Sequence, residues 1–327
     1  MKTARRRLLA LGLAPFAAPI STWAQPRKPW RIGYLAQADA AVGPDTLGQL
    51  RAGMKDLGYE EKRDYLLEVR NAKGSPERLD QFAAELAALR VDLIVASSTP
   101  PAVSALKATR SIPIVMAISG DPVGSGLIKS FARPGGNVTG TTLAFDEVNR
   151  KWLEMLIAIR PGLSHVGVVS NPANVSMRGM LDPLEASSRA LSLKLTVHHL
   201  SPGEDAETLL GKLKRNPPEG LIVLPDAHIR TYVPQIAQGL ARMRLPAVYG
   251  VAAYAEMGGL ISYGPDQRAH YRRAAAYVEK ILKGANPAEI PVEFPTRFEF
   301  VVNLKSAREA GLSIPHELLL RADKVIR

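Results

Sequence analysis

The chain has 327 residues, a formal net charge of +11 and no cysteine. The lack of cysteine excludes disulfide bonds, thiolate catalysis and a lipoprotein anchor, which needs a cysteine at its cleavage site. Beyond the N-terminal arginines the basic residues form no run, so we expect solvated surface charge and no nucleic-acid partner.

The N-terminus shows the three parts of a secretory signal peptide in order. Lys2 and the arginines at 5–7 precede an apolar stretch from Leu8 to Ile20 that is too short to span a bilayer. Small residues around Ala24 predict cleavage after it, so residues 1–24 are expected to be the signal. The paired arginines fit twin-arginine export as well as the general secretory (Sec) route. We therefore expect a periplasmic protein with no direct membrane anchor.

The first half of the mature chain alternates short β-branched runs with amphipathic helical segments. Ser75 and Pro76 open one helix, whose apolar residues recur every three or four positions from Leu79 to Leu89. The predicted strands of this half are 31–35, 65–70, 91–96 and 114–118. Strands separated by helices indicate right-handed crossovers and a parallel sheet.

The second half repeats the same plan. Its predicted strands are 165–170, 193–198, 220–224 and 247–250. The helical spacing of Trp152 with Leu156 and Ile159 predicts that this tryptophan belongs to the core. About 300 mature residues exceed the size at which one core keeps growing, so two α/β lobes are expected. A ligand cleft would then lie between the carboxyl ends of the two sets of strands.

Several segments, in order along nearly the whole mature chain, resemble one known family. They are Ile112–Met116, Gly120–Leu127, Ala132–Gly140, Ser170–Asn174, Gly258–Gly264, Ile281–Gly284, Ser313–Pro315 and Leu319–Asp323. The chain is similar to the ABC transporter substrate-binding proteins related to the tryptophan-binding TrpX type. The resemblance implies an α/β fold of two Rossmann-like lobes with parallel sheets, in the type I periplasmic-binding architecture.

That architecture also implies three crossings of the chain between the lobes, which we place near Thr142, Gly264 and Pro295. The N-terminal lobe is then expected to comprise residues 30–142 plus 265–294. The C-terminal lobe is expected to comprise residues 143–264 plus 295–327. Three strands at a hinge favour a defined opening and closing motion.

Candidate ligand-binding residues of the first lobe follow its predicted strands. Ser97, Ser98 and Thr99 end the third strand and begin a helix, where hydroxyls and backbone N–H groups can hold a carboxylate. The alternative is an ordinary helix cap followed by proline. Asp121 follows the next strand and is either a partner for a ligand ammonium or a turn aspartate. Gln37, after the first strand, is either a ligand contact or a surface loop residue.

The second lobe offers candidates in corresponding positions. Asn171 ends its first strand and alternatively starts a turn, whereas Asp226 follows its third strand and alternatively caps the next helix. Tyr249 and Tyr263 lie at later strand ends, where they either stack on a ligand or are ordinary half-buried tyrosines.

Motifs of catalysis are missing from the sequence. There is no G-x-G-x-x-G after the first strand, no Walker A sequence, and neither H-E-x-x-H nor G-x-S-x-G. The six histidines are scattered without metal-ligand spacing. We therefore expect no enzymatic activity, no metal and no cofactor.

The combined prediction is a monomeric periplasmic solute-binding protein. It would capture a small molecule in the interlobe cleft, namely an amino acid or an aromatic or other small carboxylic acid. It would then deliver this ligand to an ABC permease in the inner membrane. The alternative is a ligand-sensing receptor of the same fold that signals through a membrane sensor protein.

Overall fold

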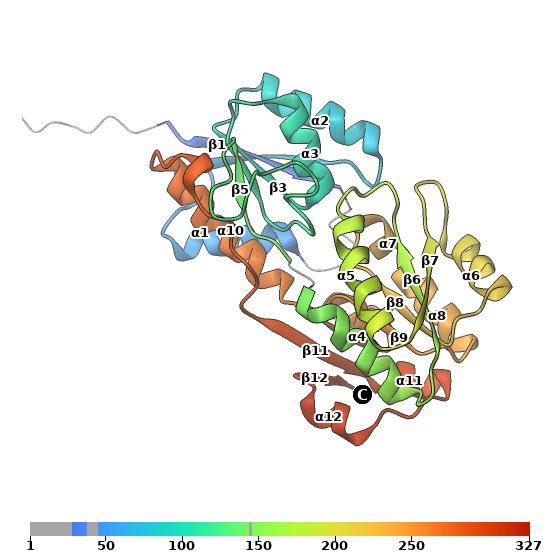
Figure 1. Ribbon diagram of the computed structural model, residues 1–327. Helices are drawn as coiled ribbons and strands as arrows, with labels where there is room; N and C mark the ends of the chain where they lie inside the picture. The colour runs from blue at the N-terminus through green and yellow to red at the C-terminus, as the bar shows by residue number, and fades with distance from the viewer. Residues whose placement is uncertain (1–27, 38–44, 144–145) are drawn as a thin grey trace, which may run out of the picture.

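The computed structural model describes residues 28–37, 45–143 and 146–327, and the expected signal peptide lies outside them. The described residues form two α/β lobes, each built around its own sheet (Figure 1). None of the described helices is both long enough and apolar enough to cross a bilayer.

The first lobe contains a five-stranded parallel sheet in the order β2-β1-β3-β4-β5. Its strands are β1 (Trp30–Ala36), β2 (Tyr65–Asn71), β3 (Leu93–Ala96), β4 (Ile114–Met116) and β5 (Val138–Gly140). The helices are α1 (Thr46–Asp56), α2 (Pro76–Ala88), α3 (Thr99–Ala108) and α10 (Gln267–Leu282), with a 3-10 turn η1 (Pro287–Glu289). Helices α1 and α10 pack together, as do α2 and α3, so both faces of the sheet are covered.

The second lobe contains a seven-stranded sheet in the order β12-β11-β10-β9-β8-β6-β7. Its strands are β6 (His165–Ser170), β7 (Lys194–His199), β8 (Gly220–Val223), β9 (Ala247–Tyr249), β10 (Ile261–Pro265), β11 (Phe298–Asn303) and β12 (Lys324–Ile326). Its helices are α4 (Asp146–Ile159), α5 (Met177–Ala190), α6 (Ala206–Arg215), α7 (Ala227–Thr231), α8 (Val233–Arg242), α9 (Ala252–Glu256), α11 (Leu304–Ala310) and α12 (His316–Arg321).

The eight predicted strands are all present, with ends that differ by no more than two residues. The predicted helix start at Ser75 is also confirmed, since its hydroxyl accepts a hydrogen bond from the Arg78 N–H and Pro76 follows. One pair departs from the expected parallel order, because β10 and β11 are antiparallel. The chain re-enters the second lobe from the hinge, so β11 starts beside the end of β10 and runs back along it.

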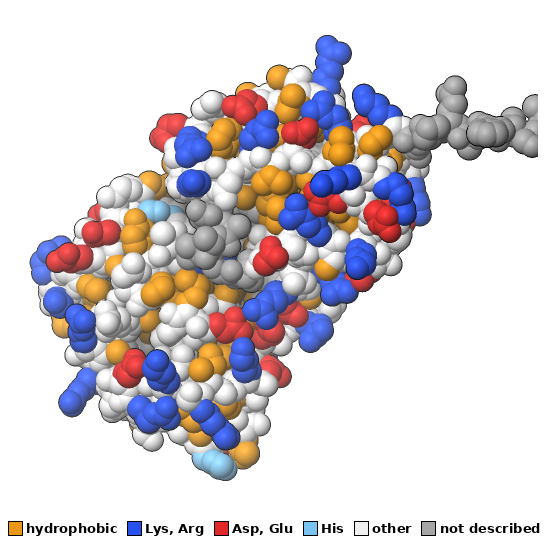
Figure 2. Space-filling view, turned by 180° about the vertical axis from the view of Figure 1, so that it is seen from behind, with side chains coloured by type: hydrophobic (Ala, Val, Ile, Leu, Met, Phe, Trp, Pro, Cys, Tyr) orange, Lys and Arg blue, Asp and Glu red, His pale blue; other side chains and the backbone are white. Residues whose placement is uncertain are grey.

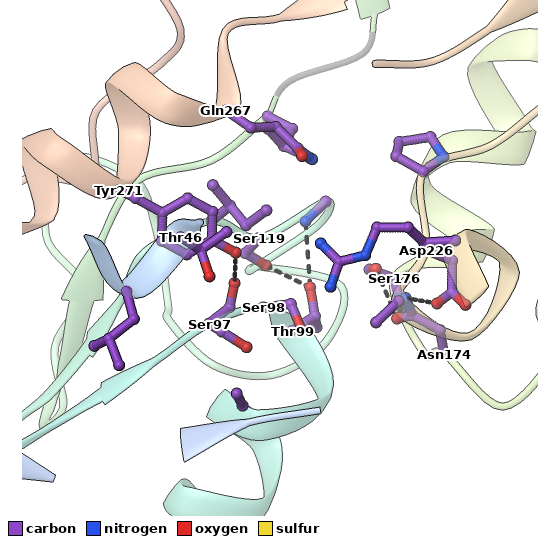
Figure 3. A pocket seen from close by; sticks show the side chains of 18 of the residues that line it. Thr46, Ser97, Ser98, Thr99, Ser119, Asn174, Ser176, Asp226, Gln267 and Tyr271 are labelled. Carbon is purple, nitrogen blue, oxygen red and sulfur yellow. Dashed lines mark hydrogen bonds between the residues drawn. The ribbon is translucent and has the colours of Figure 1, made fainter. Parts of the chain in front are cut away.

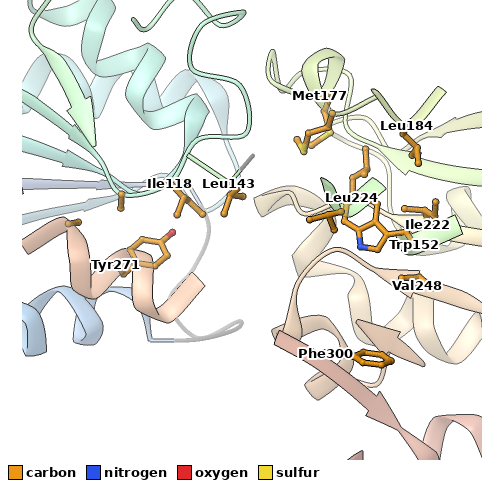
Figure 4. Packing of buried hydrophobic residues seen from close by; sticks show 14 of the residues in the cluster. Ile118, Leu143, Trp152, Met177, Leu184, Ile222, Leu224, Val248, Tyr271 and Phe300 are labelled. Atoms are coloured by element: carbon orange, nitrogen blue, oxygen red, sulfur yellow. The ribbon is translucent and has the colours of Figure 1, made fainter. Parts of the chain in front are cut away.

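The core confirms the prediction for Trp152, which is completely buried in the second lobe. Its indole N–H donates to the carbonyl of Tyr263 at 2.6 Å, and Leu224, Ile222 and Val248 lie around it (Figure 4). In the same view Ile118, Leu143 and Tyr271 lie on the first-lobe side of the gap between the lobes. This cluster of buried apolar residues therefore contains members from both lobes.

The chain passes between the two sheets three times, and the crossing segments are hydrogen-bonded to one another. The Thr142 N–H donates to the Glu293 carbonyl, and the Glu293 N–H donates to the Gly140 carbonyl. Nearby, the Asp266 N–H donates to the Arg297 carbonyl at 3.0 Å. These links restrict the hinge to coordinated movement of the three segments.

A buried histidine supports this hinge. His270, in the first turn of α10, is hydrogen-bonded through Nδ1 to the Thr141 hydroxyl at 2.9 Å. Burial lowers the pKa of His270 to about 4, so the imidazole is neutral at physiological pH. The hinge interior therefore carries no histidine charge.

The outer surface carries charges of both signs. Figure 2 shows Lys and Arg side chains interspersed with Asp and Glu over both lobes on the face opposite to that of Figure 1. Many form exposed ion pairs, such as Arg273 with Glu293 and Arg51 with Glu61. This face presents no extended single-sign patch.

Candidate ligand-binding cleft

The two lobes face each other across a cleft at the carboxyl ends of their parallel strands, where ligands bind in such sheets. The cleft contains about 950 Å³ of space that no atom fills, part of it open to solvent. Figure 3 shows polar side chains from both lobes around this space. The lining residues are Tyr34, Ala36, Thr46, Leu47, Val69, Asn71, Ser97, Ser98, Thr99, Ile118, Ser119, Gly120, Leu143, Asn174, Ser176, Met180, Pro225, Asp226, Ala227, Arg230, Tyr254, Gln267 and Tyr271.

The first-lobe side is rich in hydroxyls, and we call Thr46, Ser97, Ser98, Thr99 and Ser119 the hydroxyl wall. Strand β3 ends at Ala96, and the chain turns directly into α3, so three of these residues follow one another at a strand end. The hydroxyls of Thr99 and Ser119 are hydrogen-bonded at 3.0 Å, and the Gly120 N–H donates to Thr99 Oγ1. These two hydrogen bonds hold the Thr99 side chain in place.

Ser98 is in a different situation from its neighbour. It occupies the N-cap position of α3, but its side chain makes no capping hydrogen bond to the helix. Its Oγ is buried and has no hydrogen-bond partner among the described residues. A buried hydroxyl without a partner is unfavourable unless a ligand or water satisfies it. This hydroxyl, at the positive end of a ten-residue helix, is therefore available to a ligand.

Two tyrosines support the hydroxyl wall. The Tyr34 hydroxyl is hydrogen-bonded to the Thr46 hydroxyl at 3.0 Å, and the Tyr271 hydroxyl donates to the Ser97 carbonyl at 2.6 Å. Burial raises the pKa of Tyr34 to about 12 and also raises the pKa of Tyr271. Both phenols consequently stay neutral at physiological pH.

The second-lobe side carries the charges, and we call Asn174, Ser176, Asp226 and Arg230 the charged wall. Asp226 caps α7 by accepting from the N–H groups of His228 and Ile229 at 2.8 and 3.1 Å. Its two oxygens also accept from the amide groups of Asn171 and Asn174, at 3.1 and 2.9 Å. Four donors therefore stabilise this carboxylate, and it needs no ligand cation to compensate it.

Arg230 is the free charge of the cleft. It lies four residues after Asp226, in the one-turn helix α7. Its Nε is buried without a hydrogen-bond partner, and its guanidinium has no ion pair with any described carboxylate. Burial raises the pKa values of Tyr34 and Tyr271, which belong to the other lobe, and the positive charge of Arg230 lowers both of them in part. Arg230 thus acts electrostatically across the cleft, where a ligand anion would lie.

The structure places four of the predicted site residues in the cleft lining: Ser97, Ser98, Thr99 and Asp226. Asp226 is also the helix cap that the sequence offered as its alternative. Asn171 is buried behind the lining and reaches the cleft only through its bond to Asp226.

The other predicted site residues do not line the cleft. Asp121 accepts from the Gly124 N–H at 2.7 Å, as a turn aspartate does. Tyr249 is fully buried with its ring edge-on to Tyr254, and Tyr263 stacks on Phe298. Gln37 is buried, and its side-chain oxygen has no partner among the described residues.

Several lining residues went unpredicted, and two could have been found. Arg230 follows Asp226 at helical spacing, which places it on the same face of α7. Gln267 begins α10 immediately after a predicted crossing. Tyr34 and Thr46 gave no signal, because their role depends on how α1 packs beside β1. Within the described ranges no cluster of three metal-ligating side chains is found.

Comparison with known proteins gives a consistent picture. The family model described as ABC transporter substrate binding protein matches residues 44–326. A protein of Clostridioides difficile (strain R20291) named tyrosine-binding protein is 26% identical over 280 residues, which cover 83% of this chain and 79% of that protein.

Solved structures show the same two-lobed fold. A conserved domain protein from Vibrio cholerae superposes with a TM-score of 0.83 at 25% identity, covering 91% of this chain and all of that one. An ABC domain from Streptococcus pneumoniae in complex with L-Trp superposes with a TM-score of 0.81 at 24% identity, with the same coverage. A ligand-free, open substrate-binding protein from Clostridium difficile gives a TM-score of 0.64 at 23% identity, over 91% of this chain and 99% of that one.

Proposed function

The chain belongs to the family of ABC transporter substrate-binding proteins, and we propose that its cleft captures a small carboxylic acid for delivery to an ABC importer. The ligand would be an amino acid or an aromatic or other small acid. The protein would bind it without converting it, as a monomer in the periplasm after removal of residues 1–24. Closure would bring residues 30–142 plus 265–294 against residues 143–264 plus 295–327.

One observation carries this proposal. The cleft holds a buried guanidinium nitrogen of Arg230 and a buried hydroxyl of Ser98, neither of which has a partner among the described residues. They come from opposite lobes, and both can donate hydrogen bonds. A ligand carboxylate would accept from both, and so would join the two lobes.

The remaining lining suits an apolar or aromatic body. Ile118, Leu143 and Met180 contribute apolar side chains to the lining, which also includes Tyr254. Methionine adapts to varied shapes and contacts aromatic rings favourably. The names of two similar proteins, one tyrosine-binding and one solved with L-Trp, support an aromatic amino acid as the first candidate.

The first test is a thermal-shift screen of the mature protein after unfolding and refolding to remove carried-over ligand. The library should contain each carboxylic acid together with its neutral amide. A ligand at a hundred times its Kd adds about 2.7 kcal/mol, which raises the melting temperature of a chain of about 300 residues by about 4 °C. We expect saturable shifts from acids and none from their amides. Equal shifts from both members of each pair would refute the carboxylate assignment.

Delivery needs a second measurement. Membrane vesicles from cells that make this protein should take up the radiolabelled ligand only when ATP and the loaded protein are both present. The ligand recovered from the protein should be chemically unchanged. Tight binding without any uptake would favour the alternative, a sensory receptor of the same fold.

A further inference from the structure

Two glycines meet at the edge of the cleft, one from each lobe. Gly120 follows β4 in the first lobe, and Gly179 lies in the first turn of α5 in the second lobe. A Cβ atom added at Gly179 would collide with the Asp121 side chain, with the Cβ of Asp121 only 2.6 Å away. Neither glycine has a positive φ, so close approach, and not backbone conformation, is what requires glycine here.

The Asp121 side chain cannot move aside to relieve such a collision. Its Oδ1 accepts a hydrogen bond from the Gly124 N–H at 2.7 Å, which fixes the side chain in its turn. The colliding Cβ also moves only with the backbone, and Pro122 follows directly. A side chain at position 179 would therefore push the two lobes apart.

The contact is also close around Gly120, although less so than around Gly179. A Cβ at Gly120 would lie 3.0 Å from Ser176 Oγ and 3.0 Å from the terminal methyl of Met180. The Ser176 hydroxyl donates to Asn174 Oδ1 at 2.8 Å, which holds it in place. Gly120, Ser176 and Met180 also line the cleft, so this contact borders the candidate ligand site.

We propose that Gly179 is a positioning residue for ligand capture, because the absence of a side chain there allows α5 to close against Gly120 and Asp121. The ligand part of this inference rests on the proposed function, whereas the lobe contact does not. If only the closed state binds tightly, the apparent Kd rises by the same factor by which the closed population falls. Ligand affinity should therefore depend on a residue that need not touch the ligand.

The decisive variant is Gly179→Ala, and Gly211→Ala is its matched control. Both glycines lie in helices, but a Cβ at Gly211 would approach only the end of the Arg215 side chain, at 4.0 Å. Alanine is the better helix former, so neither variant should lower the melting temperature of the ligand-free protein. We expect Gly179→Ala to raise the ligand Kd about tenfold or more, and Gly211→Ala to leave it unchanged.

Closure can be measured without ligand, because the chain has no native cysteine to interfere with labelling. Spin labels at Lys107→Cys and Arg189→Cys, exposed positions on opposite lobes, report the interlobe distance. Gly179→Ala should shift the distance distribution to longer values. Adding Asp121→Gly, which removes the colliding atoms, should restore it.

The outcomes separate the two proposals. If Gly179→Ala changed neither the interlobe distance nor the ligand affinity, the inference would be overturned. A Gly179→Ala variant that no longer folds would also overturn it, because the predicted collision affects only the contact between the lobes. Longer distances in a protein that binds no carboxylic acid at all would support the lobe contact and refute the proposed ligand class instead.

Discussion

The two walls of the cleft differ in the polar groups that they present. The hydroxyl wall is neutral, and most of its groups are hydrogen-bonded to one another or to supporting tyrosines. The charged wall contains Asp226 and Arg230, the two charged side chains among the described residues of the lining. One lobe therefore offers a fixed array of weak donors and acceptors, and the other offers charge.

The two charges of the second wall are themselves unequal. Asp226 is surrounded by four donors from its own lobe, whereas Arg230 has no acceptor among the described residues. A guanidinium with a buried Nε that lacks an acceptor is unfavourable until an acceptor approaches it. On the proposed function, the aspartate would shape the second lobe and the arginine would select the ligand.

Replacing Arg230 should have the largest effect on ligand affinity. Arg230→Met keeps most of the side-chain volume and removes the cation. We expect the Kd for a carboxylate ligand to rise about 100-fold, or about 3 kcal/mol, as for other buried charge pairs that lose one partner. Calorimetric titration would measure it, with Arg242→Met, at an exposed position on α8, as the control. If both variants lost the same affinity, Arg230 would have no special role and the proposed difference between the walls would be wrong.

Replacing the aspartate should mainly affect folding. Asp226→Asn would replace the oxygen that accepts from Asn174 with an amide NH₂, so two NH₂ groups would face each other, while the oxygen that caps α7 and accepts from Asn171 would remain. Asn174 cannot rotate freely to adapt, because its Oδ1 already accepts from Ser176. We expect the free energy of unfolding to fall by about 2 kcal/mol, measured by urea denaturation.

The control for this prediction is Asp205→Asn, at the exposed cap of α6, where asparagine caps about as well as aspartate. Its stability should change by less than about 0.5 kcal/mol. If Asp226→Asn is as stable as wild type but no longer binds, the aspartate contacts the ligand and the division of roles is wrong.

The smallest effect on ligand affinity is expected from a substitution in the hydroxyl wall. Ser98→Ala removes a hydroxyl with no internal partner, so stability should not change. The Kd should rise about five- to tenfold, corresponding to about 1 kcal/mol for one hydrogen bond. Ser104→Ala in the same helix, which loses a bond to Asp80, should lower stability and leave binding intact. If Ser98→Ala lowered stability and left binding intact, Ser98 would not face the ligand.

The sequence predicted the hydroxyl wall better than the charged wall for a physical reason. Ser97 to Thr99 follow a buried strand directly, and the end of a parallel strand must face the cleft edge. Arg230 lies in a helix of only five residues, so its spacing of four residues from Asp226 was the one signal for it in the sequence. Tyr249 ends β9 and Tyr263 lies in the middle of β10, and alternation along a strand sends each residue to one face or the other. Helix packing, which no local pattern reveals, directs Tyr249 to the core.

The burial of Trp152 has an optical consequence. Two of the chain's three tryptophans lie among the described residues, Trp30 at the start of β1 in the first lobe and Trp152 inside the second. Neither lines the cleft. Among the described residues each lobe therefore carries one tryptophan, shielded from water to a different degree. Emission recorded with and without Trp152→Phe would follow the melting of each lobe separately, without any added dye.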